Sequence, residues 1–112
     1  MRNSGYQLIK HAIDQGMFIS VQDAYDADNV FYRGNGLGKA WEEAQCMDEI
    51  VIEFYTDGEF GGDDHAGWAF LVHGNDPCET VSDYSMSERG KWIEDWWHTT
   101  DGGQYPELID QQ

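Results

Sequence analysis

Positively charged residues are scarce in this chain of 112 residues, which has 6 Lys and Arg against 22 Asp and Glu. The net charge of −16 opposes the approach of DNA or RNA, so we expect no direct nucleic-acid partner. A small domain ordinarily carries a net charge of only about 2–8 in magnitude, because self-repulsion beyond that range destabilises the compact state. Something other than the stability of the fold therefore favours the acidity of this chain.

Cysteines and long apolar runs are also scarce. Cys46 and Cys78 form no CxxC motif, and no histidine stands at zinc-finger spacing, so the sequence predicts neither a disulfide framework nor a zinc site. No run approaches the ~20 apolar residues of a membrane span, and the N-terminus lacks the apolar region of a secretory signal. We therefore expect a reduced, cytoplasmic protein with no membrane partner.

The chain does contain enough apolar sequence for one domain, since 40% of its residues are hydrophobic and five are tryptophan. Its central stretch, residues 49–73, has two alternating apolar runs around a loop rich in glycine and acid, which predicts a β-hairpin. Residues at period two lie on one face of a strand. Those predicted to form the core face of this hairpin are Ile50, Ile52, Phe54, Trp68, Phe70 and Val72.

The remaining elements follow from apolar spacing and from helix and turn signals on both sides of this hairpin. Ser4 is the predicted cap of the first helix, and the tryptophans of the last helix are predicted to pack on the sheet. The predicted elements are, in order, a helix at 4–16, strands at 17–21 and 29–33, a helix at 37–47, strands at 49–56 and 68–73, an edge strand at 79–84 and a helix at 86–97. This α-β-β-α-β-β-α order predicts one α+β domain over residues 1–112. The predicted domain has an antiparallel sheet of four or five strands, two or three helices packed on one face, and an irregular tail at 99–112.

No motif predicts a reaction, so we expect no catalytic residue, metal or cofactor. Asp63, Asp64 and His65, with His73, are residue types that bind divalent metals, but their spacing is unspecific, and a solvated acidic loop explains them better. The glycine-rich stretch at 34–39 differs from a phosphate-binding loop in its spacing, and it lacks the hydroxyl residue that should follow its lysine. A non-enzymatic role is therefore expected.

The acidic surface has two interpretations. A folded chain of this length is about 34 Å across, and duplex DNA of that length carries about 20 negative charges, at one charge per ~1.7 Å. In the first interpretation, carboxylates imitate the phosphates of a duplex and occupy the basic groove of a nucleic-acid-binding protein. In the second, the acid excess is an adaptation for solubility. For the first interpretation, the candidate partner-binding residues are Asp23, Asp26, Asp28, Glu42, Glu43, Asp57, Glu59, Asp63 and Asp64.

Four short stretches, at 19–23, 67–69, 79–85 and 96–97, resemble a group of small proteins encoded by tailed phages and prophages. They read ISVQD, GWA, ETVSDYS and WW, and they are spread over most of the chain. The resemblance implies a phage origin and the α+β order. Because small acidic phage proteins often inhibit host defence, it also implies an inhibitor of the anti-CRISPR or anti-restriction type.

Composition and resemblance together lead to one hypothesis. The chain is expected to be a DNA mimic that binds the basic nucleic-acid-binding surface of a CRISPR effector complex in the host cytoplasm. The alternatives are an inhibitor of a restriction enzyme or of another host DNA-binding protein, and an acidic, solubility-adapted protein with another binding role. The sequence leaves the oligomeric state and the identity of the partner open.

Overall fold

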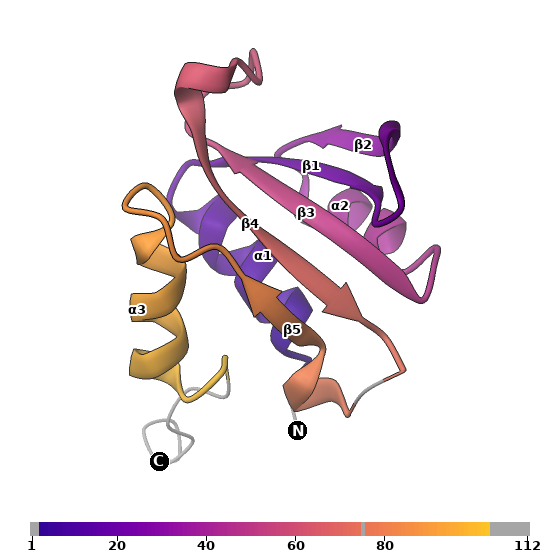
Figure 1. Cartoon of the computed structure of the whole chain (residues 1–112), viewed down its shortest axis with the longest axis vertical. Coiled ribbons are helices and arrows are strands. Elements are labelled where there is room, and N and C mark those ends of the chain that lie inside the picture. The colour runs from indigo at the N-terminus through magenta and orange to yellow at the C-terminus, as the bar shows by residue number, and fades with distance from the viewer. Residues whose placement is uncertain (1–2, 75, 104–112) are drawn as a thin grey trace.

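One antiparallel sheet of five strands, in the order β2-β1-β3-β4-β5, forms one layer of the molecule, and the helices pack behind it (Figure 1). The computed structural model describes residues 3–74 and 76–103. The elements of this part of the chain are helices α1 (Ser4–Asp14), α2 (Leu37–Ala44) and α3 (Lys91–Thr100) and strands β1 (Phe18–Asp23), β2 (Asp26–Gly34), β3 (Glu49–Tyr55), β4 (His65–Val72) and β5 (Val81–Tyr84). The α+β class, the antiparallel sheet and the element order are confirmed, and β5 is the predicted edge strand.

Helix α1 begins at a different capping residue from the one predicted. The side chain of Asn3 accepts hydrogen bonds from the backbone N–H groups of Gly5 and Tyr6, at 2.8 and 3.2 Å. Ser4 is instead fully buried, and its hydroxyl accepts a hydrogen bond from Val81 N at 2.9 Å. Ser4 therefore joins the helix to β5, and the adjacent asparagine takes a capping role that either residue type can fill.

Helix α2 ends at Ala44, three residues before its predicted end. Ala40 and Ala44 are fully buried in the core, where their small side chains allow the helix to approach the sheet closely. Met47, which was predicted to continue the apolar face, lies beyond the helix and is 38% exposed. The segment 45–48 then leads directly into β3.

Helix α3 is displaced along the chain relative to its prediction. It begins at Lys91, after a hydrogen-bonded turn over residues 87–90, so the predicted capping-box residues precede it. It continues to Thr100, so the predicted irregular tail begins later than residue 99. The rest of that tail, residues 104–112, lies outside the described residues. The three tryptophans of α3 pack in or against the core, as predicted.

The central hairpin joins β3 to β4, and only its first strand faces the core as predicted. The buried side chains of this hairpin are Ile50, Ile52, Phe54, Ala66, Ala69 and Leu71. The prediction for β4 was wrong, because Trp68, Phe70 and Val72 alternate with the buried residues and lie on the opposite face of the sheet. No helix of the described residues covers that face.

The close approach of α3 explains which face of β4 is covered. Gly67 has a φ of +121°, and a Cβ atom added there would lie 3.1 Å from Gly90 Cα and 3.0 Å from Ile93 Cδ1. The indole N–H of Trp92 donates a hydrogen bond to the carbonyl of Ala66 at 2.7 Å. Bulky side chains do not fit at this separation, so the covered face of β4 contains alanine and glycine beneath the helix.

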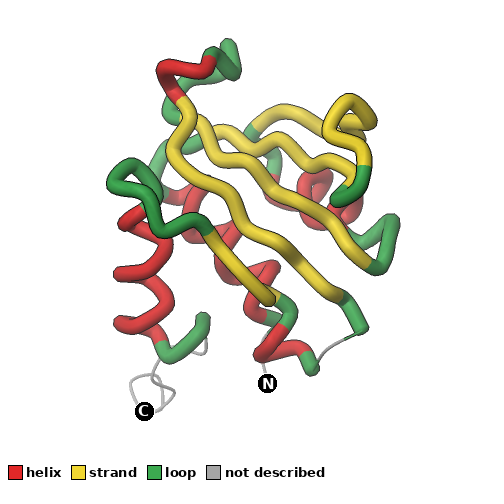
Figure 2. Tube along the Cα trace, viewed as in Figure 1, coloured by secondary structure: helices red, strands yellow, loops and turns green. Residues whose placement is uncertain are grey.

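The molecule is elongated, with extents of 43 × 28 × 24 Å and a radius of gyration of 13.3 Å. The loop between β3 and β4 extends beyond the sheet at one end, and the β1–β2 turn lies at the other end (Figure 2). None of the helices within the described ranges is long and apolar enough to cross a membrane. Two of the acidic segments that the sequence singled out therefore lie at opposite ends of the sheet.

Candidate partner-binding surface

The first group of predicted partner-binding acids lies at the β1–β2 turn. Asp23 Oδ1 accepts a hydrogen bond from Tyr25 N at 2.9 Å, and Asp26 Oδ1 accepts one from Asp28 N at 3.1 Å. Through such Asx turns the carboxylates close the hairpin and remain at the surface. Tyr25, at the tip, is 78% exposed. The turn therefore presents negative charge and one aromatic ring to solvent.

The second group lies in the loop 56–64. Asp57 Oδ1 accepts a hydrogen bond from Glu59 N at 2.8 Å, which forms a third Asx turn. The ring of Phe60 packs edge-on against Tyr55 at a centroid distance of 5.2 Å and anchors the loop to the sheet. The other acids of this group, which form a short 3-10 turn with the preceding glycine, are Asp63 and Asp64.

The third group consists of Glu42 and Glu43 on α2, in the helical layer. Glu43 pairs with Lys39 one turn earlier, at 3.1 Å. This hydrogen bond, followed by the charges of Glu42 and Glu43, raises the pKa of Lys39. The helix therefore offsets part of the negative charge of this group with its own lysine.

These nine carboxylates do not form one cluster. In the register of β1 with β3, Asp23 lies opposite Ile50 and Phe18 lies opposite Tyr55, so the β1–β2 turn and the loop are at opposite ends of the sheet (Figure 1). The seven residues of β3 separate them by about 20 Å, at ~3.3 Å per residue. The structure therefore distributes the candidate acids over both ends of the sheet and one helix.

The candidate nucleophiles and metal ligands are also dispersed. Both cysteines are free thiols, and partial burial, with the charges of Glu43 and Asp23, raises the pKa of Cys46 and disfavours its reactive thiolate. His65 begins β4 and His73 follows its last residue, so the whole strand separates them. In the part of the chain that the structure describes, no three His, Cys, Asp or Glu side chains are grouped to hold a metal ion.

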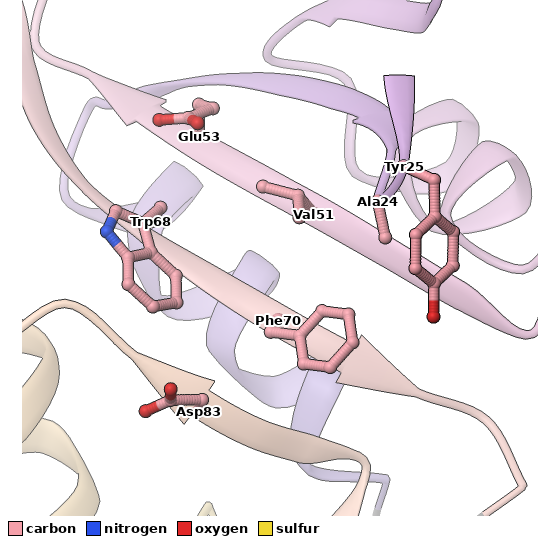
Figure 3. Close-up of a pocket in the computed structure, with 7 residues that line it drawn as sticks. All are labelled: Ala24, Tyr25, Val51, Glu53, Trp68, Phe70 and Asp83. Atoms are coloured by element: carbon pink, nitrogen blue, oxygen red, sulfur yellow. The ribbon is translucent and has the colours of Figure 1, made fainter. Parts of the chain in front are cut away.

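The uncovered face of the sheet carries a groove that sequence patterns alone did not reveal. Its floor is formed by Val51 of β3 and by the rings of Trp68 and Phe70 of β4 (Figure 3). Its volume is about 400 Å³, and it is open to solvent. We call it the open-face groove, and its lining residues are Ala24, Tyr25, Val51, Glu53, Trp68, Phe70 and Asp83.

The β1–β2 turn forms one end of the open-face groove. Ala24 and Tyr25 line that end, and the hydroxyl of Tyr25 donates a hydrogen bond to the carboxylate of Glu49 on β3. This contact holds the turn against the start of β3. The acidic turn and the apolar floor therefore belong to one continuous surface.

Two carboxylates border the aromatic floor. Glu53 accepts a hydrogen bond from His65 Nε2, and its side chain is only 22% exposed. Burial, and then the charge of Glu53, raises the pKa of the neighbouring Tyr55 hydroxyl. Asp83 is exposed on the edge strand β5, on the other side of the floor. The groove is therefore apolar at its base and negative along its border.

One sequence signal could have indicated this groove. The run at 67–72 is apolar at both alternations, which is typical of a strand with apolar side chains on both faces. A bulge then determines which side chains face outward. Glu53 pairs with Trp68 and Tyr55 pairs with His65, so β4 has one residue more than β3 between these pairs. Sequence spacing does not contain that shift.

Comparison with models of protein families, with curated proteins and with solved structures finds no match to this chain. A function for it must therefore be argued from its own charges and surfaces. Within the described residues, two features are available for that argument: the dispersed carboxylates and the open-face groove.

Proposed function

We propose that this chain is a non-enzymatic inhibitor that occupies the nucleic-acid-binding groove of a partner protein, with carboxylates in the places of phosphates. The observation that carries the proposal is the charge per unit length. A net charge of −16 along a longest extent of 43 Å corresponds to about one net negative charge per 2.7 Å, and duplex DNA carries one per ~1.7 Å. This density is high enough for the domain to be steered into a basic groove.

The lysines of the helices do little to interrupt this field. Lys10, Lys39 and Lys91 each pair with a carboxylate four residues later on the same helix. Exposed pairs of this kind contribute little to stability, but each neutralises its lysine locally. None of these three pairs involves the acids at the two ends of the sheet, where Arg89 contacts the loop by donating a hydrogen bond to the carbonyl of Asp63.

The resemblance to proteins of tailed phages favours a partner among host defence complexes. We expect a CRISPR effector complex in the host cytoplasm first, and a restriction enzyme or another host DNA-binding protein second. Each of these binds duplex DNA through Lys and Arg side chains, to which an extended array of carboxylates is complementary.

Inhibition of DNA binding tests the proposal. Purified CRISPR effector complexes and restriction enzymes from one host would be titrated with the chain at constant labelled duplex, and bound duplex would be followed by fluorescence anisotropy. We expect at least one of them to lose duplex binding, in a manner that excess duplex reverses and that weakens as salt rises. Unchanged duplex binding across the whole panel would instead favour the solubility interpretation.

Charge-reversed variants distinguish the acids from the shape of the domain. The acids unsuited to reversal, because they close turns, are Asp23, Asp26 and Asp57. The double variant Glu59→Lys with Asp63→Lys changes the loop without removing such a turn. Asp14→Lys with Asp95→Lys makes the same change in net charge on α1 and α3 and is the matched control. We expect the loop variant to slow association more than the control, and an undiminished inhibition by the loop variant would contradict a role for its acids.

A further inference from the structure

The open-face groove combines two features that point to one kind of ligand. Its floor consists of the rings of Trp68 and Phe70 with the side chain of Val51, and its border carries the carboxylates of Glu53 and Asp83. Among the described residues that line it, none is lysine or arginine. A ligand for this groove must therefore offer a flat or apolar surface together with positive charge.

Other ligand classes fit this combination poorly. Nucleic-acid bases stack on aromatic platforms, but the carboxylates of Glu53 and Asp83 repel the phosphates that accompany bases. A wholly apolar ligand would remove water from both carboxylates without replacing their hydrogen bonds. Anionic small molecules are repelled by the same border and by the net charge of −16.

The register of the sheet places the two charges on either side of the rings. Glu53 lies directly opposite Trp68 on β3, and Asp83 lies opposite Phe70 on β5. Side chains paired in this manner on one face have Cβ atoms about 4.5–5.5 Å apart. Figure 3 shows Trp68 between the two carboxylates. A cation stacked on the indole would thus have a carboxylate within reach on each side.

We propose that the open-face groove binds an arginine side chain carried on a basic segment of the partner protein. This inference rests on the proposed function, in which the partner presents a basic surface. A guanidinium group is planar, stacks on aromatic rings and has donors at its edge for Glu53 and Asp83. Its three-carbon stem can cover Val51 and Phe70. A lysine ammonium is a compact and strongly hydrated point charge, so it uses the flat floor less well.

The chain itself holds one arginine in a comparable manner. The guanidinium carbon of Arg33 lies 5.4 Å from the centroid of the Phe60 ring, and its Nε donates a hydrogen bond to the hydroxyl of Ser20 at 3.4 Å. This internal contact shows how an aromatic ring and a neighbouring acceptor together receive a guanidinium group. The open-face groove offers the same two components, with carboxylates in place of the hydroxyl.

Two peptides of equal charge test the inference. An arginine nonapeptide and a lysine nonapeptide, each with neutral blocked ends, would be titrated into the full chain by isothermal calorimetry at one salt concentration. We expect the arginine peptide to bind about three- to tenfold more tightly, and the variant Trp68→Leu to remove that preference. Equal affinities of the parent chain for the two peptides would overturn the proposal.

Variants in which carboxylates are neutralised show whether those of the groove bind the arginine peptide. The double variant Glu53→Gln with Asp83→Asn should weaken arginine-peptide binding by about tenfold. The control Asp14→Asn with Asp95→Asn, which changes the net charge equally on the helices, should weaken it by less than about threefold. If both variants lost the same affinity for the arginine peptide, binding would depend only on the net charge of the chain, which contradicts a site in the groove. Far-ultraviolet circular dichroism would confirm that each variant is folded.

The peptide experiment and the DNA-binding panel fail independently. If arginine preference is absent but a panel member loses duplex binding, the groove inference is wrong and the proposed function stands. If arginine preference is present and depends on Trp68, but no panel member loses duplex binding, the groove binds arginine while the proposed role as a DNA mimic fails.

Discussion

Gly67 determines how closely α3 approaches the sheet. Its φ of +121° is unfavourable for residues with a Cβ atom, and an added Cβ would lie 2.8 Å from the hydroxyl oxygen of Ser85 and 3.1 Å from the backbone of Gly90. We expect Gly67→Ala to lower the free energy of unfolding by about 2–4 kcal/mol, from strain and overpacking together. Urea denaturation measures this loss.

A second glycine provides the control. Gly38 lies in the first turn of α2, and a Cβ added there meets no atom within 4 Å. Gly38→Ala should therefore raise the free energy of unfolding by about 0.4–1 kcal/mol, because it restricts the unfolded chain. If both substitutions changed stability by the same amount, close packing at Gly67 would not be the reason for the small residues on β4.

His11 links the stability of the domain to pH. Its ring lies against Trp92 and Trp96, at centroid distances of 6.0 and 6.2 Å. Burial, opposed by the charge of Asp14, lowers the pKa of His11 below its ordinary value of 6.5. The neutral ring is favoured in the fold, so this contribution to stability is complete above pH 6.5 and is lost as pH falls through the lower folded-state pKa.

The variant His11→Gln tests this linkage. Glutamine does not titrate, so the variant should lose less stability than the parent chain when the pH is lowered from 7 to about 5. Urea denaturation at the two pH values gives the difference, in which the contributions of the other titratable groups cancel. An identical pH dependence of both proteins would show that protonation of His11 is not coupled to folding.

At the scale of elements, one face of β4 is buried beneath the helices and the other lines the open-face groove. Phe54, across the hairpin, is fully buried, and its ring meets Trp92 at a centroid distance of 5.0 Å. Phe54→Ala should therefore cost about 3–5 kcal/mol. Trp68 is only partly buried on the uncovered face, so Trp68→Ala should cost less than about 2 kcal/mol and leave the chain folded. If urea denaturation showed that Trp68→Ala and Phe54→Ala lose the same free energy of unfolding, Trp68 would have to be buried in the core.

How far the sequence predicts each element depends on whether local spacing or a partner element decides its orientation. The alternation of Ile50, Ile52 and Phe54 was sufficient for β3, because three of the four residues on its other face are polar. The four are Glu49, Val51, Glu53 and Tyr55. The outward face of β4 depends on a bulge and on the approach of α3, which begins 19 residues after β4 ends. Neither influence is visible in the spacing of Trp68 and Phe70.

The same distinction holds for the candidate site. The acids of the β1–β2 turn and of the β3–β4 loop could be located on their segments from sequence, because turn-forming residues surround them. That they lie at opposite ends of the sheet follows only from the pairing of β1 with β3. The open-face groove depends on side chains from β3, β4, β5 and the β1–β2 turn, so it required the complete sheet order.

At the scale of the whole molecule, the net charge of −16 should make the fold sensitive to salt. Between about 0.01 M and 1 M salt the Debye length falls from ~30 Å to ~3 Å, so repulsion among the acids is largely screened. We expect the melting temperature at pH 7 to rise over this range, since the helical ion pairs that salt weakens are exposed and contribute little to stability. A constant or falling melting temperature would contradict net self-repulsion in the folded state.

The most direct test of the account is whether the chain and duplex DNA exclude each other from one partner. For a defence complex that the chain inhibits, the complex would be mixed with saturating amounts of both, and the masses of the assemblies would be measured by analytical ultracentrifugation. If the chain is a DNA mimic, we expect two binary assemblies, partner with chain and partner with duplex, in proportions set by the ratio of chain to duplex. A ternary assembly of partner, chain and duplex would show that the chain binds outside the nucleic-acid groove, and that its acids do not stand in for phosphates.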